Sequence, residues 1–109
     1  MKITQQTSSD TITFTLDGEL DASSSSILDE ALGNPELLSY SKALIDCSKL
    51  RYISSAGLGV FISHIKRLQD ANVKLVFFNM KDKIFNVFEV LGLDTLLTIV
   101  PTEAEAAIA

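Results

Sequence analysis

The segment best suited to chemistry is a pair of serines followed by two glycines, Ser54-Ser55-Ala56-Gly57-Leu58-Gly59. The serines stand where an apolar stretch passes into a helical pattern, at the positive N-terminus of a helix. A serine there can cap the helix, and a phosphoserine is favoured by the same charge. The glycines each cost about 1 kcal/mol of helix stability relative to alanine, which indicates a close approach of another chain segment or of a partner. Two interpretations stay open: a structural cap with tight helix–sheet packing, or a phosphorylated docking surface.

Catalysis by these serines is not favoured. A hydrolase nucleophile elbow requires Gly-x-Ser-x-Gly, and Ile53 stands where the first glycine would be. The single histidine, His64, follows Ser55 by about two and a half helical turns, so it points to the other side of the helix and is expected to be exposed. We therefore expect that the protein is not an enzyme.

Cofactor and metal motifs are missing from the sequence. Gly57 and Gly59 lack the third glycine of G-x-G-x-x-G, and no phosphate-binding loop, HExxH or EF-hand pattern occurs. One cysteine, Cys47, and one histidine cannot form a zinc cluster or an internal disulfide. We expect no cofactor and no metal, with Cys47 acting as a small core hydrophobe at a strand end.

A second polar segment, Asp17-Gly18-Glu19-Leu20-Asp21, concentrates three carboxylates and precedes the serine cluster Ser23–Ser26. It suits a strand-to-helix turn in which Asp21 or one of the serines caps the helix. It also suits a recognition edge that presents Glu19 and Asp21 beside Ser55. The two segments would meet if the strands before them are parallel neighbours, because the carboxyl ends of such strands share one edge.

Composition restricts the partners. The chain has 109 residues, 47% of them apolar and 21% charged, which fits a single globular domain over residues 1–109. Nine basic against 14 acidic residues give a net charge of −5, which disfavours nucleic acid. No apolar run suits a membrane helix or a secretory signal, so we expect a cytoplasmic protein without membrane insertion.

Apolar patterning predicts alternating strands and helices. Strict alternation over 11–16 predicts a strand with one buried face, and 1–4 is a candidate edge strand. Further strands are expected at 42–47, 73–78 and 96–100, with loops at 17–21 and 48–52. Helices are expected up to Gly33, from the serine pair to Asn72, over 81–91, and from Pro101, where proline opens the first turn. The predicted buried stripe of the second helix comprises Leu58, Phe61, Ile62, Ile65 and Leu68.

The order of elements predicts an α/β fold. Three segments in this order resemble the STAS domain of bacterial anti-sigma factor antagonists: Gly18-Glu19-Leu20-Asp21 before a serine-rich helix start, Leu44-Ile45-Asp46-Cys47-Ser48, and Ile53-Ser54-Ser55-Ala56-Gly57-Leu58-Gly59-Val60. The resemblance runs over almost the whole chain. It implies a STAS-like fold with a four- to five-stranded mixed sheet and about four helices packed mainly on one face.

The resemblance also implies a partner-switching function. In this family the unphosphorylated form binds an anti-sigma factor that is also a serine kinase of the GHKL type, which releases the sigma factor. Phosphorylation of a serine at the start of the second helix ends the binding, and a PP2C-type serine phosphatase resets the cycle. Alignment on Gly57-Leu58-Gly59 places that serine at Ser55, with Ser54 as the alternative. The partner-binding residues implied are Glu19, Asp21, Ser23, Ser54, Ser55, Ala56, Gly57, Leu58 and Gly59.

Two positions depart from the family motif. Ser54 stands where the family has aspartate, and Ala56 stands where it has serine or threonine.

Two alternative functions stay open. One is a STAS scaffold or regulatory domain that binds a phosphatase, a stress-signalling complex or a transporter. The other is a small-ligand or nucleotide-binding domain that uses the helix terminus as an anion site.

Overall fold

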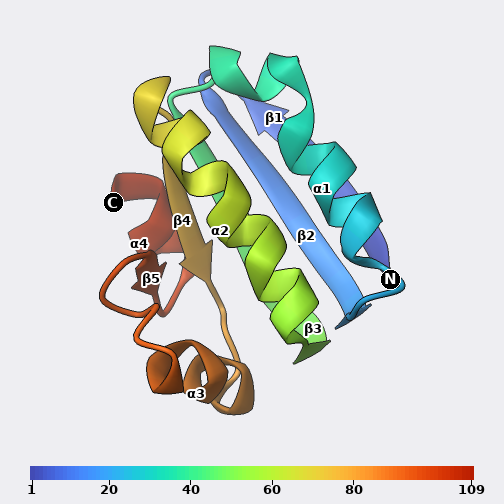
Figure 1. Cartoon of the computed structure of the whole chain (residues 1–109). Coiled ribbons are helices and arrows are strands. Elements are labelled where there is room, and N and C mark those ends of the chain that lie inside the picture. Colours follow the sequence, from blue (N-terminus) through green and yellow to red (C-terminus); the bar gives the residue numbers. More distant parts are fainter.

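A five-stranded sheet in the order β1-β2-β3-β4-β5 forms the centre of the computed structural model, which describes residues 1–109 (Figure 1). The strands are β1 (Lys2–Ser8), β2 (Thr11–Leu20), β3 (Lys42–Ile53), β4 (Lys74–Phe78) and β5 (Thr98–Val100). The helices are α1 (Ser25–Gly33), a short 3-10 helix (Pro35–Ser39), α2 (Ser55–Asp70), α3 (Asp82–Val90) and α4 (Glu103–Ile108).

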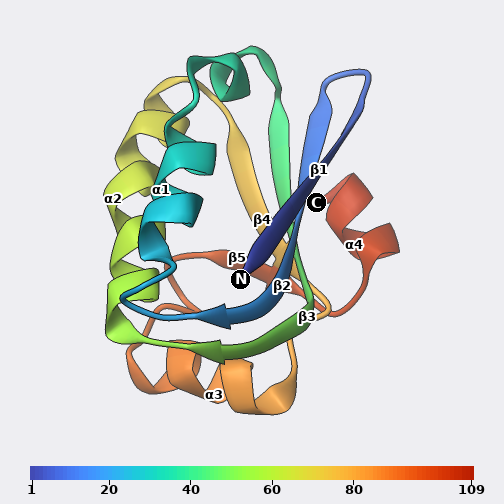
Figure 2. The same ribbon diagram turned by 90° about the vertical axis from the view of Figure 1, so that its right-hand side faces the viewer.

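The sheet is mixed, as expected. β1 pairs with β2 antiparallel, and the pairs β2–β3, β3–β4 and β4–β5 are parallel. The helices α1 and α2 lie side by side on one face, α3 lies beyond the ends of the strands, and α4 lies alone on the opposite face (Figure 2). The α/β class and the mixed five-stranded sheet predicted from the sequence are therefore confirmed.

Alternation in β2 sends its apolar side chains toward α1 and α2, where they join one large core. Ile12, Phe14 and Leu16 are buried. The centre of that core is aromatic, because the ring of Phe77 meets those of Phe61 and Phe88 edge-on at centroid distances of 4.9 and 5.7 Å. These three rings hold β4, α2 and α3 together.

The strands β2 and β3 run further than the sequence predicted. The segments 17–21 and 48–52 were expected to be loops, but β2 continues to Leu20 and β3 to Ile53. Their pairing persists from Asp17 opposite Lys49 to Leu20 opposite Ile53, with one register shift just before Asp17 and one between Gly18 and Glu19. Gly18 accommodates this bulged stretch with a φ of 122°. The polar side chains misled the prediction because they occupy a bulged strand end rather than a loop.

Two residues of α2 lie differently from the prediction. Ile62, expected in the buried stripe, is 45% exposed. His64, expected to be exposed, has a side chain only 13% exposed, and its Nε2 lies 2.8 Å from Oδ1 of Asp29 on α1. Both errors have one cause: α1 packs against the side of α2 that carries His64, which leaves Ile62 outside.

Smaller corrections concern the ends of two elements, β3 and α4. Cys47 lies within β3 rather than at its end, and burial is the main cause that raises the pKa of its thiol above the ordinary range. Pro101 precedes α4 instead of opening its first turn, and the hydroxyl of Thr102 caps that helix by accepting a hydrogen bond from the Glu105 N–H at 3.2 Å. None of the helices is long and apolar enough to cross a bilayer.

The aromatic centre gives a test of the core. Phe77 is 0% exposed, so Phe77→Ala should lower the free energy of unfolding by about 3–5 kcal/mol through lost burial and a cavity. Val90 is 83% exposed, and Val90→Ala should change the free energy of unfolding by less than about 0.5 kcal/mol. Urea unfolding of the two variants measures the difference. Equal unfolding midpoints would contradict the packing described here.

Candidate functional site

The two polar segments meet at one edge of the sheet. Leu20, the last residue of β2, lies in register with Ile53 at the end of β3. The Ser54 N–H donates a hydrogen bond to the Leu20 carbonyl oxygen at 2.9 Å, which joins the chain before α2 to the end of β2. The expectation that parallel neighbouring strands bring the acidic segment beside the serine pair is confirmed.

The two serines have different structural roles. Ser54 is the N-cap of α2, and its Oγ accepts a hydrogen bond from the Gly57 N–H at 3.3 Å. Ser55 is the first residue of the helix and is exposed to solvent. The cap interpretation therefore applies to Ser54, and the Ser55 hydroxyl is accessible to a modifying enzyme without loss of the cap.

The two glycines also have different structural roles. A Cβ on Gly57 would lie 2.5 Å from Cγ and 3.1 Å from the carbonyl oxygen of Leu20, whose side chain is fully buried. Gly57 is therefore required by packing within the chain. A Cβ on Gly59 would meet nothing within 4 Å, so internal packing gives no reason for a glycine there. Of the expected contact residues, Gly57 and Leu58 are buried, whereas Ser55, Ala56 and Gly59 are exposed.

The acidic segment ends in a tightly bonded turn before α1. Oδ1 of Asp21 accepts hydrogen bonds from the backbone N–H groups of Ser23 and Ser24 at 3.0 and 3.1 Å, and from the Ser23 hydroxyl at 2.7 Å. These bonds to the charged form lower the pKa of Asp21, first through the Ser23 side chain and then through that of Ser24. The carboxylate is therefore held ionised and fixed in position, while Glu19 is exposed.

Ser24 is a residue of this turn that the sequence analysis did not separate from its neighbours. It is the buried polar residue of the chain, 5% exposed. Its hydroxyl donates to the Glu19 carbonyl oxygen at 2.8 Å and accepts from the Asp21 N–H at 3.0 Å, so it bridges the end of β2 to the turn. It occupies the N-cap position of α1 without a side-chain capping bond. Four consecutive serines carry no signal that tells the bridging one from the exposed ones.

A polar hollow beside the turn adds two basic residues that sequence reasoning missed. Arg51 and Lys2 line it together with the carboxylates of Asp17, Glu19 and Asp21. Nη1 of Arg51 lies 3.6 Å from Oδ1 of Asp17 across the β2–β3 pair. Only the register of these two strands brings Arg51 here, and the extension of β3 through 48–52 was not predicted.

The arrangement supports binding and modification rather than catalysis by Ser55. The one histidine is engaged with Asp29 between α1 and α2. The accessible part of the site consists of an exposed hydroxyl on a positive helix end, small residues beside it and a fixed carboxylate nearby. Fold and site together define a small α/β domain with an exposed serine at a helix start, an arrangement suited to protein binding.

Comparison with known proteins agrees with this class. The STAS domain profile matches residues 2–106. The anti-sigma-B factor antagonist of Listeria monocytogenes is 34% identical over 88 residues, which are 81% of this chain and 77% of that protein. The chain therefore belongs to the STAS domain family and, within it, to the anti-sigma factor antagonists.

Solved structures support the fold. An anti-sigma factor antagonist from Mycobacterium paratuberculosis superposes with a TM-score of 0.84 at 19% identity and covers 98% of this chain and 91% of its own. The phosphorylated form of the Bacillus cell fate determinant SpoIIAA gives a TM-score of 0.72 at 18% identity. The match covers 98% of this chain and 97% of that protein. At these identities the two structures establish the shared fold.

The different roles of the glycines predict substitutions of opposite sign. Gly57→Ala should lower the free energy of unfolding by about 1–2 kcal/mol, because the overpacking against Leu20 exceeds the gain in helix propensity. Gly59→Ala should raise it by about 0.5–1 kcal/mol, because the methyl group meets open space. Urea unfolding measures both values, and a change of the same sign in the two variants would refute the assignment.

Proposed function

We propose that this protein binds an anti-sigma factor through the surface around Ser55 while that serine is unphosphorylated, and that phosphorylation of Ser55 ends the binding. The observation that carries the proposal is that the two serines have different roles. Ser54 caps α2, and Ser55 remains exposed at the same helix end. The kind of partner is supported by the curated relatives, which are named as anti-sigma-B factor antagonists.

The resemblance extends this proposal to the enzymes of the cycle. We propose that the anti-sigma factor is also a GHKL-type serine kinase that phosphorylates Ser55, and that a PP2C-type phosphatase removes the phosphate. The protein itself then acts as a substrate and not as a catalyst. The engagement of His64 with Asp29 supports this, because it leaves Ser55 without a histidine as general base.

The switch follows from the electrostatics of the helix end. A phosphate adds a charge of about −1.5 to −2, which the N-terminus of α2 stabilises in the free chain. In a docked interface the same charge must lose its water, and it adds to the negative charge of Glu19 and Asp21. A penalty of about 3 kcal/mol weakens binding about 150-fold, which is sufficient for a switch.

The docking surface extends along the outer side of α2. Gly59 and Ile62 follow Ser55 at intervals of four and three residues, so the three share one face of the helix. Ile62 is 45% exposed, and Gly59 has open space where a side chain would stand. We propose that a segment of the anti-sigma factor lies over Gly59 and buries Ile62.

Two substitutions of Ser55 test the switch. Ser55→Ala should bind the anti-sigma factor with nearly the affinity of the unmodified protein, whereas Ser55→Asp should bind on the order of 10- to 100-fold more weakly because it places a charge in the interface. Isothermal calorimetry measures both affinities. Ser54→Ala serves as the control, since it should lower stability by about 1 kcal/mol through loss of the cap and retain binding. Equal affinities for the alanine and aspartate variants of Ser55 would remove the basis of the proposal.

A third substitution tests the extent of the surface. Ile62→Ser should weaken binding of the anti-sigma factor about tenfold, because it removes the apolar contact that the partner segment makes beyond Gly59. Val90→Ser is the matched control, since Val90 is an exposed aliphatic residue on α3 and is 83% exposed. Calorimetry on both variants should show a loss for Ile62 alone. Unchanged binding by Ile62→Ser would confine the surface to the first turn of α2.

A further inference from the structure

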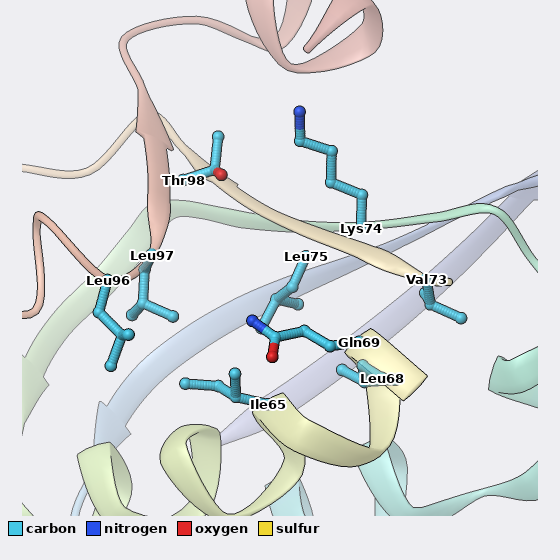
Figure 3. Close-up of a pocket in the computed structure, with 9 residues that line it drawn as sticks. All are labelled: Ile65, Leu68, Gln69, Val73, Lys74, Leu75, Leu96, Leu97 and Thr98. Atoms are coloured by element: carbon cyan, nitrogen blue, oxygen red, sulfur yellow. The ribbon is translucent and has the colours of Figure 1, made fainter. Parts of the chain in front are cut away.

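A small apolar crevice lies between the C-terminal half of α2 and the strands β4 and β5 (Figure 3). Its volume is about 120 Å³. It lies about 15 Å along α2 from Ser55, as judged from the helical rise to Ile65, and shares no residue with the docking surface. Its apolar lining consists of Ile65, Leu68, Val73, Leu75, Leu96 and Leu97.

The crevice exists because the chain before β5 does not close over α2. β5 has only three residues, Thr98–Val100, and Leu96 just before it is 57% exposed. Ile65 and Leu75 are half-buried on the two walls. Protein interiors contain few voids larger than a water molecule, and an apolar wall without partner atoms loses its dispersion contacts. An apolar occupant would restore those contacts.

The polar groups around the crevice define the charge of that occupant. The side-chain amide of Gln69 lies over the apolar walls (Figure 3). Lys74 and Thr98 belong to the lining through their backbones, but their side chains extend from the opposite side of the strands. The crevice thus offers one amide that can donate or accept a hydrogen bond and no charged group for a carboxylate or an ammonium ion.

We propose that this crevice binds a small, neutral, largely apolar molecule that carries one polar substituent. An apolar cavity of about 150 Å³ accommodates benzene, so a volume close to this suits a single ring of about six to nine nonhydrogen atoms with its substituent at the open side. The apolar part of the molecule lies between Ile65 and Leu97, and its substituent bonds to the Gln69 amide, which lies beside Ile65 and Leu75 (Figure 3). Because the crevice is separate from Ser55, this binding does not depend on the anti-sigma factor.

Titration with benzamide tests the site, and benzoate is its charged counterpart with the same ring and the same number of nonhydrogen atoms. In protein with labelled methyl groups, benzamide should shift the NMR signals of Ile65, Leu75 and Leu97 in a saturable manner, with a dissociation constant of about 1 mM or below. The methyl signals of Ile27 and Leu91, which are exposed elsewhere, should remain in place. Benzoate should bind at least about tenfold more weakly, because nothing in the crevice compensates its charge.

A matched pair of variants tests the role of the amide. Gln69→Leu should weaken benzamide about fivefold through loss of one hydrogen bond, and Gln6→Leu, the same change at an exposed position of β1, should leave it unchanged. Both positions are exposed, so the fold is retained. The proposal is overturned by any of three results: no saturable shift up to about 20 mM benzamide, equal binding of benzoate, or equal affinities for the two variants.

Discussion

The contact between Gly57 and Leu20 is the constraint on which the site depends. There is no room for a Cβ on Gly57, since it would lie 2.5 Å from the Leu20 side chain. The Ser54 N–H bond to the Leu20 carbonyl oxygen closes the same junction from the other side. These contacts fix the start of α2 relative to the end of β2, and they also position the Asp21 turn, which follows Leu20 directly.

At this junction some residues of the motif make contacts within the chain that the fold requires, whereas others make none. Ser54 caps the helix and Gly57 permits the close approach. Ser55, Gly59 and Ile62 share the outer face of α2 and take no part in the core. The three lie together on the side of α2 where the proposed partner would approach.

The sequence predicted much of this architecture because local pattern and tertiary structure agree. The alternation over 11–16 and the change between strand and helix periods lead to the observed order of elements, and the serine–glycine motif marks the start of α2. The prediction failed where pairing or packing decides. Asp17–Leu20 continues β2 because its register with β3 and the positive φ of Gly18 permit a bulged strand. The positions of His64 and Ile62 depend on how α1 lies against α2, which a single helical period does not contain. The different roles of Gly57 and Gly59 likewise require the position of Leu20.

The central claim is that Ser55, and not the capping Ser54, receives the phosphate that controls binding. Peptide mapping by mass spectrometry, after the protein has been incubated with ATP and the anti-sigma factor kinase of the same organism, tests this most directly. The account predicts a single phosphate on Ser55 and none in the Ser55→Ala variant. A phosphate on Ser54, or an unmodified protein after incubation with an active kinase, would contradict it.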